Sequence, residues 1–153
     1  MHKIVDAKEA VSNIKSGSTI VIGGAGAGHA VPDMILKALG DYFIETGNPR
    51  DLYVINPCGI GDNDTRGLNH IALEGLVKTD VAGFWGNAPK MVKLAQENKI
   101  EGYNLPQGVL SQLMRATASR KPGILTHVGL NTFVDPRHEG GKINEITRED
   151  IES

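Results

Sequence analysis

The sequence predicts an α/β fold with an open, mainly parallel sheet and helices on both faces. Short apolar, β-branched runs alternate along the chain with helical segments of about 10 to 15 residues, and this alternation is typical of parallel sheets. The 153 residues include 19 glycines, more than the average share of about 7%. Such an excess suggests many tight turns between strands and helices.

The first half of the chain is expected to hold two helices and two strands. The first helix opens at a capping box of Asp6 and Glu9, and the second opens at Pro32 with Asp33. Both strands are brief apolar runs, and turn-forming residues fill the loop that follows the second. The expected order is a helix at 6–17, a strand at 19–22, a helix at 32–47, a strand at 52–55 and a surface loop at 56–64.

The second half continues the alternation. Asn87 is a possible helix cap, and Pro122 with Gly123 ends the last long helix. The expected order is a short helix at 68–73, a strand at 77–84, a helix at 88–99, a strand at 100–105, a helix at 107–120 and a strand at 124–128. After Arg137 the sequence becomes polar and glycine-rich, and a helix opening at Thr147 is cut off almost at once. We therefore expect a partial α/β domain at 1–137, truncated at its C-terminus, and a tail at 138–153.

Composition excludes several classes of protein. A formal net charge of -2 and a pI near 6.2 give no reason to expect nucleic-acid binding, which favours clustered basic residues. Cys58 is the single cysteine, so an intrachain disulfide is impossible. No run approaches the ~20 apolar residues that span a bilayer, and no stretch of signal-peptide length follows Met1. We expect no membrane partner and a cytoplasmic location.

A glycine-rich segment at residues 23–28 lies between the first strand and the second helix. A phosphate-binding P-loop needs Lys and Ser or Thr after its last glycine, whereas His29 and Ala30 follow Gly28. A dinucleotide site needs a third glycine at the position of His29 and an acidic residue where the second strand ends at Asn56. Two interpretations stay open: tight packing of helix on sheet, or a site for an anion or oxyanion.

Other polar residues are weaker candidates. Cys58 follows the second strand, where nucleophiles do occur, but a lone cysteine is more often inert, so a hydrolase that uses it is a minor alternative. The histidines lack the spacing of metal ligands, and no metal site is expected. Gln107 follows Pro106 at a strand-to-helix junction. Its amide could donate to a developing carbonyl oxyanion, but the residues alone favour a plain first residue of a helix.

Several segments together resemble the family I coenzyme A transferases, in particular the propionate or short-chain acyl-CoA:acetate type with both halves fused. The similar stretches are the first strand with its glycine segment and Pro32-Asp33, and residues 75–78, 97–104, 107–108, 129–137 and 140–144. Enzymes of this family have an open α/β fold in two related halves with the active site between them. By this resemblance, residues 1–153 are most of the N-terminal half.

The resemblance also implies a site and a chemistry. Gln107 matches the family's glutamine near the oxyanion, and the implied substrate-binding residues are Gly24, Ala25, Gly26, Gly28, Gln107 and Gly108. The nucleophilic glutamate belongs to the C-terminal half, and no segment here resembles its motif. It attacks acyl-CoA, forms a mixed anhydride and then holds CoA as a glutamyl thioester for the second acid. The chain alone is expected to be inactive.

The same resemblance sets the expected ligands and partners. Coenzyme A thioester is a substrate rather than a permanently bound cofactor, and the partners are acyl-CoA, a short-chain carboxylate and the C-terminal half or a second subunit, in a homo-oligomer. Two departures concern the glycine segment: Ala25 stands where the family usually has an aromatic residue, and Pro32 comes one residue late. The alternative is a non-catalytic ligand-sensing domain of the related sugar-phosphate isomerase-like fold.

Overall fold

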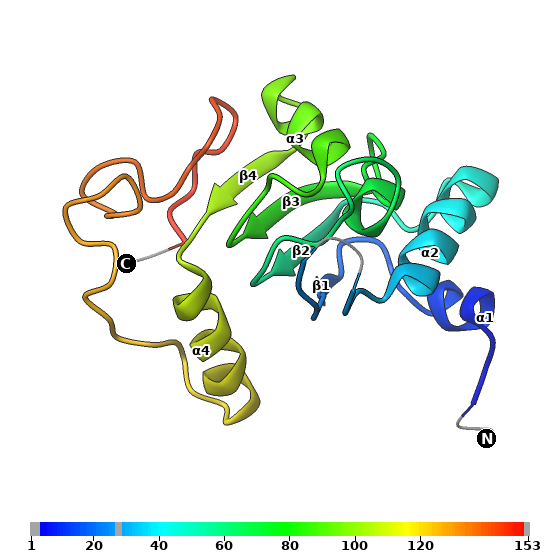
Figure 1. The fold of residues 1–153 in the computed structure, drawn as a ribbon, viewed down its shortest axis with the longest axis horizontal. Coiled ribbons are helices and arrows are strands. Elements are labelled where there is room, and N and C mark those ends of the chain that lie inside the picture. Colours follow the sequence, from blue (N-terminus) through cyan, green and yellow to red (C-terminus); the bar gives the residue numbers. More distant parts are fainter. Residues whose placement is uncertain (1–3, 27–28, 152–153) are drawn as a thin grey trace.

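The computed structural model describes residues 4–26 and 29–151, and its centre is a four-stranded parallel sheet (Figure 1). The strand order is β1-β2-β3-β4, and each neighbouring pair is parallel. The elements are α1 (Ala7–Ser12), β1 (Thr19–Val21), α2 (Asp33–Thr46), β2 (Leu52–Asn56), the 3₁₀ helix η1 (Gly67–His70), β3 (Val77–Ala82), α3 (Pro89–Gln96), β4 (Glu101–Asn104) and α4 (Gln107–Ala118). The expected α/β fold with an open parallel sheet is confirmed.

Helices cover the two faces of the sheet unequally. The closed face, defined by Leu52 and Val54 of β2, packs against α1, α2, η1 and α3 in the larger core cluster. On the opposite face Val81 and Tyr103 pack with Leu110 of α4 in a smaller cluster. Figure 1 shows α4 standing apart from the other three helices. Helices on both faces are therefore present, and among the described helices α4 is the one on the second face, which we call the α4 face, where Val134 also packs.

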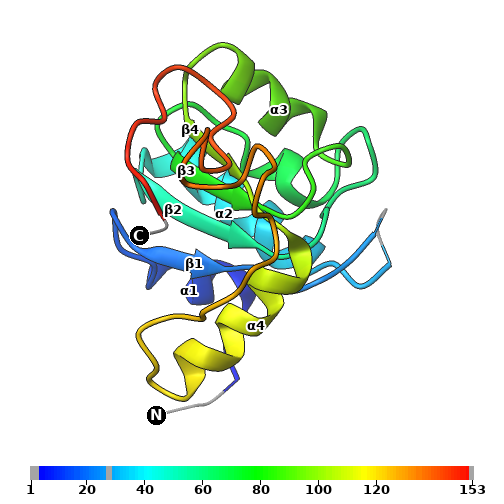
Figure 2. The ribbon, with the colours of Figure 1, turned by 90° about the vertical axis from the view of Figure 1, so that its left-hand side faces the viewer.

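The two edges of the sheet also differ (Figure 2). Beside β4, Tyr103 pairs antiparallel with Lys142, and the Asn104 N–H donates to the Gly141 carbonyl at 2.8 Å. The Gly102 N–H donates to Thr147 Oγ1, also at 2.8 Å. At the other end of the strand order, β1 pairs with β2 and has no strand on its outer side within the described residues. The β4 edge is thus covered by the chain's own C-terminal segment.

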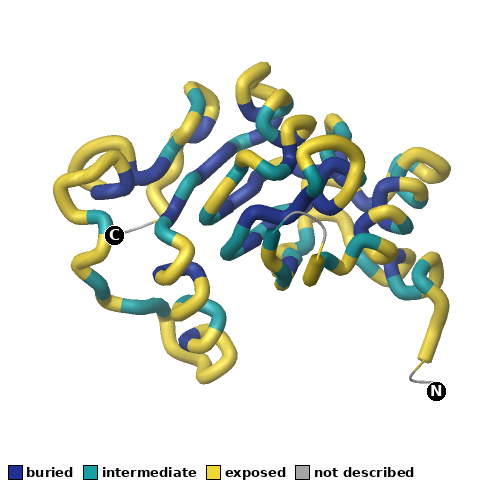
Figure 3. The backbone as a smooth tube through the Cα atoms, viewed as in Figure 1, coloured by how far each residue is buried: buried dark blue, intermediate teal, exposed yellow. Residues whose placement is uncertain are grey.

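The strand expected at 124–128 is absent, and that prediction is wrong. These residues form an irregular segment after α4, and Leu125 is fully exposed. Figure 3 shows most of this segment as exposed. A strand needs a neighbour, and the free side of β4 is already occupied by residues around Lys142. An apolar, β-branched run was therefore not enough to make a strand here.

The helix expected to open at Thr147 is also absent. The Thr147 hydroxyl instead accepts from the Gly102 N–H and donates to Asn144 Oδ1. The Asn144 amide in turn donates to the carbonyls of Ala95 and Ile100, at 2.8 Å each. The division at residue 137 stays a prediction, although residues 141–147 clearly pack on the sheet.

Candidate functional site

The carboxyl ends of the four parallel strands bring four loops to one edge of the sheet, where open α/β sheets place their ligands. The loops begin after Val21 of β1, Asn56 of β2, Ala82 of β3 and Asn104 of β4. The last of them, Leu105-Pro106, leads directly into α4. Residues 23–26 of the glycine segment and Gln107 therefore lie at this edge.

Gly83 brings the loop after β2 against the start of α4. A Cβ atom placed on Gly83 would lie 2.1 Å from the Pro57 carbonyl oxygen and 3.1 Å from the Cα of Gln107. No side chain fits in that space, so only glycine allows the three segments to approach this closely. Gln107 is consequently held beside the ends of β2 and β3.

Gln107 is the first residue of α4 and is exposed to solvent. Pro106 precedes it, and the Leu110 N–H donates to the Pro106 carbonyl at 3.1 Å. Gly108 is also exposed, and a Cβ placed on it would meet no atom within 4 Å. The amide of Gln107 and the backbone of Gly108 thus border open space at the positive end of the α4 macrodipole, which favours developing negative charge.

The second segment that carries the family resemblance, residues 129–137, packs beside this helix start. A Cβ on Gly129 would lie 2.3 Å from Val134 Cγ2 and 3.8 Å from Pro106 Cγ. The Asp135 carboxylate accepts from Arg137 Nη2 at 2.6 Å and from the Asn131 N–H at 2.7 Å. These hydrogen bonds lower the pKa of Asp135, and the bond from the Arg137 side chain has the largest effect. Asp135 therefore fixes this loop as a carboxylate.

The glycine segment is tied to its surroundings through the backbone. The Gly26 N–H donates to the Gly59 carbonyl at 3.0 Å, and the Ala25 N–H donates to the Ala30 carbonyl at 3.3 Å. Gly24 has φ +142, and a Cβ on it would lie 2.4 Å from the Ala30 oxygen. Two of the expected anion-binding N–H groups are thus already occupied, which favours the packing interpretation for them. Gly28 lies outside the described residues.

Two buried polar side chains, Asp80 and Asn56, lie beneath this edge. The sequence alone did not single them out as a pair. Asp80 of β3 and Asn56 of β2 are each 0% exposed. Both carboxylate oxygens of Asp80 and Oδ1 of Asn56 have no hydrogen-bond partner among the described residues. Burial raises the pKa of Asp80 to about 8. The available signal was one acidic residue inside the apolar run at 77–84.

Cys58 and His70 are tied into the surroundings of the sheet by polar contacts. Cys58 is half-buried, and its carbonyl accepts from Asn56 Nδ2 at 3.1 Å. His70 Nε2 lies 3.1 Å from Asp33 Oδ1. Across the described ranges no three His, Cys, Asp or Glu side chains gather as metal ligands, and no helix is long and apolar enough to cross a membrane.

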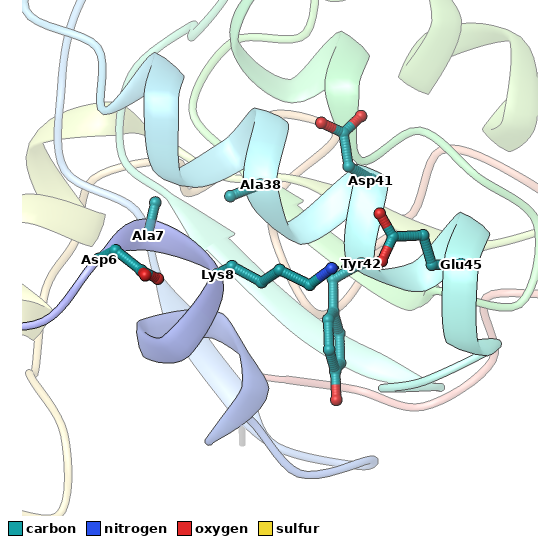
Figure 4. A pocket seen from close by; sticks show the side chains of 7 residues that line it. All are labelled: Asp6, Ala7, Lys8, Ala38, Asp41, Tyr42 and Glu45. Carbon is teal, nitrogen blue, oxygen red and sulfur yellow. Dashed lines mark hydrogen bonds and ion pairs between the residues drawn. The ribbon is translucent and has the colours of Figure 1, made fainter.

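The hollows of the surface lie away from the carboxyl edge or beside α4. One hollow of about 330 Å³ lies between α1 and α2. Figure 4 shows Lys8 reaching across it toward Glu45, whose carboxylate it meets at 2.6 Å. This hollow contains no expected site residue. An apolar groove of similar volume lies between α4 and the segment that follows it, lined by Leu110, Leu113, Val128 and Val134 among others.

The fold is the one that the resemblance to coenzyme A transferases implies, and comparison with known proteins agrees. The model of the coenzyme A transferase family matches residues 4–149. The chain belongs to the coenzyme A transferase family.

Two relatives and one solved structure illustrate how this chain relates to that family. The chain is 46% identical over 148 residues to acetate CoA-transferase YdiF of Escherichia coli K12, covering 97% of this chain and 28% of YdiF. It is 42% identical over 151 residues to caffeate CoA-transferase of Acetobacterium woodii, covering 99% of this chain and 29% of that protein. The crystal structure of the acyl-CoA transferase YdiF apoenzyme from Escherichia coli O157:H7 superposes with a TM-score of 0.93 over 97% of this chain and 29% of that chain, at 46% identity.

The chain thus spans less than a third of the length of these relatives. This agrees with the expected N-terminal half, or a part of it. The alternative of a ligand-sensing domain has no support from these matches.

Proposed function

We propose that this chain forms one wall of the active site of a CoA-transferase that moves CoA between a short-chain acyl-CoA and acetate or a similar acid. The observation that carries the proposal is the position of Gln107. It is exposed at the start of α4, against the carboxyl ends of β2 and β3, in a chain that belongs to the coenzyme A transferase family. The neutral amide stabilises an oxyanion without the net charge that would trap a carboxylate substrate.

The reaction requires a carboxylate nucleophile that we place on a part of the protein outside this chain. That glutamate attacks the acyl-CoA carbonyl and expels the CoA thiolate, which leaves an acyl-glutamyl anhydride. The thiolate then attacks the glutamyl carbonyl and releases the first acid, and the second acid repeats the two steps in reverse. Each attack forms a tetrahedral oxyanion, and Gln107 is the residue of this chain proposed to donate to it.

The finer features of this function stay predictions. They are a preference for propionate or another short acyl group, binding of substrate along Gly24, Ala25, Gly26, Gly28 and Gly108, assembly with a C-terminal half or second subunit into a homo-oligomer, and a cytoplasmic location. The names of the relatives, an acetate and a caffeate CoA-transferase, show that acyl groups of quite different size occur in similar proteins. The acyl preference must therefore be measured.

The test replaces Gln107 in the complete protein and follows transfer of CoA from acyl-CoA to acetate. We expect Gln107→Ala to lower kcat by about 10²- to 10³-fold, the usual loss for one oxyanion donor, with a smaller change in KM. Gln112→Ala is the matched control, because Gln112 is an exposed glutamine on the same helix. Equal kcat values for the two variants would contradict the role of Gln107.

A further inference from the structure

Asp80 is a buried acid that the proposed reaction does not use. It lies in the middle of β3, opposite Val54 of β2 and Gly102 of β4. Its exposed fraction is 0%, and neither carboxylate oxygen has a partner among the described residues. An ionised carboxylate without a donor is among the costliest groups to bury, and proteins normally neutralise it instead. Asp80 therefore needs a physical explanation of its own.

Asn56 presents the complementary problem one strand away. It ends β2 opposite Ala82, so it lies on the same face of the sheet as Asp80, one alternating position further along. Its Nδ2 donates to the Cys58 carbonyl at 3.1 Å, but its Oδ1 has no donor within the described part of the chain. Two buried acceptors on neighbouring strands thus lack a hydrogen-bond donor within the described residues, and they are diagonal neighbours on one face of the sheet.

We propose that Asp80 is held as a neutral carboxylic acid whose O–H donates to Oδ1 of Asn56, and that this bond positions the loop after β2. One proton then satisfies an acceptor on each strand, whereas an ionised Asp80 would set a carboxylate near an amide oxygen with no donor for either. Burial alone raises the pKa of Asp80 to about 8. Tyr53, the nearby titratable group of β2, has its own pKa raised to about 12, mainly by burial, so it is neutral in the same range.

The bond would act on the candidate site through Asn56. The amide of Asn56 donates to the Cys58 carbonyl. The carbonyl of the next residue, Gly59, accepts from the Gly26 N–H. The Pro57 carbonyl oxygen lies against Gly83, which in turn lies beside Gln107. Asp80 is therefore a positioning residue for the floor of the carboxyl-edge site. Only this last step rests on the proposed function; the protonation of Asp80 does not.

The protonation is tested by infrared difference spectroscopy on the complete protein, comparing wild type with Asp80→Asn between pH 5 and about pH 9. We expect a protonated carboxyl C=O band in wild type at low pH that is absent from the variant and that disappears with a midpoint near the raised pKa of about 8. A carboxylate signal from Asp80 already at pH 6 would overturn the inference. This readout needs no enzymatic activity.

The positioning role is tested by kinetics of the complete protein. Asp80→Asn keeps a donor for Asn56 Oδ1, so we expect kcat within about twofold of wild type and independent of pH near 8. Asp80→Val removes the donor at similar size, and we expect kcat to fall at least tenfold below that of Asp80→Asn. Equal losses in both variants would overturn the positioning role. Inactivity of wild type itself would instead contradict the proposed function and leave the spectroscopic result to decide the protonation.

Discussion

One face and one edge of the sheet are well covered by the chain, and the other face and edge are less completely covered. We call the closed face with the β4 edge the closed side, and the α4 face with the β1 edge the open side. The closed face packs against α1, α2, η1 and α3, and residues 141–147 cover the β4 edge. On the open side, Val21 of β1 is 53% exposed, and α4 covers only the part of its face near Val81 and Tyr103. A chain that spans less than a third of its relatives therefore holds a core of its own, while one side of its sheet is less completely covered within the described residues.

The largest expected effect lies on the closed face and concerns pH. Burial raises the pKa of Asp80 from its ordinary value of 3.8 to about 8, so the folded chain binds more protons than the unfolded chain between these values. The free energy of unfolding therefore falls as pH rises from about 4 to about 8, by up to about 1.4 kcal/mol per pH unit. Asp80→Asn should flatten this dependence, measured by urea unfolding at several pH values.

Asp64→Asn serves as the control, because Asp64 is an exposed loop residue with no comparable burial. It should change the free energy of unfolding by less than about 0.5 kcal/mol. Identical slopes for wild type and Asp80→Asn would show that Asp80 is ionised in the folded chain and hence that its burial is relieved by a donor outside the described contacts.

The next effect compares two leucines on the two sides. Leu39 of α2 is 1% exposed, whereas Leu125 after α4 is fully exposed. Leu39→Ala should lower the free energy of unfolding by about 2–5 kcal/mol, because it leaves a cavity in the larger core cluster. Leu125→Ala should change it by less than about 0.5 kcal/mol. Chemical denaturation measures both, and a large loss from Leu125→Ala would mean that the segment at 124–128 packs in solution.

The strands and helices of the closed face were predictable from sequence. They follow from periodicity and from local signals, such as the Asp6 cap, whose carboxylate accepts from the Glu9 N–H at 2.8 Å, and the left-handed Gly47 that ends α2. These signals act within a few residues, so a single sequence contains them. The expected strand-to-helix junction at Gln107 is likewise confirmed, because Gln107 is the first residue of α4.

The sequence alone did not show which of several distant segments would pack against a given strand. The run at 124–128 has strand-like residues, but residues near Lys142 had already taken the free edge of β4, and Thr147 bonds to that strand instead of capping a helix. The pairing of Asp80 with Asn56 likewise depends on the register of β2 and β3, which periodicity does not fix. Each missing inference needed a contact between residues far apart in the chain.

A smaller effect tests how the β4 edge is closed. Thr147 Oγ1 accepts from the buried Gly102 N–H at 2.8 Å, and Thr147→Val keeps the shape but leaves that N–H without an acceptor. The free energy of unfolding should fall by about 1–3 kcal/mol, and hydrogen exchange of the Gly102 amide should accelerate. Thr126→Val is the matched control, because the Thr126 hydroxyl accepts from the Val128 N–H in an exposed segment. Equal losses in both would mean that the edge contributes no more than a surface turn.

The smallest change in stability is expected at the open edge, where the effect appears instead in association. An edge strand with exposed apolar side chains is a template for pairing with another chain, and a lysine there opposes such pairing. We expect the 153-residue chain to self-associate, and Val21→Lys to shift it toward monomer in light scattering, with less than about 0.5 kcal/mol change in unfolding free energy. Met34→Lys adds the same charge at an apolar residue of α2 that is 76% exposed, on the closed side, and should leave association unchanged. If the wild-type chain is monodisperse as a monomer, or if both lysines act alike, the β1 edge is not the surface at which this chain meets its partners.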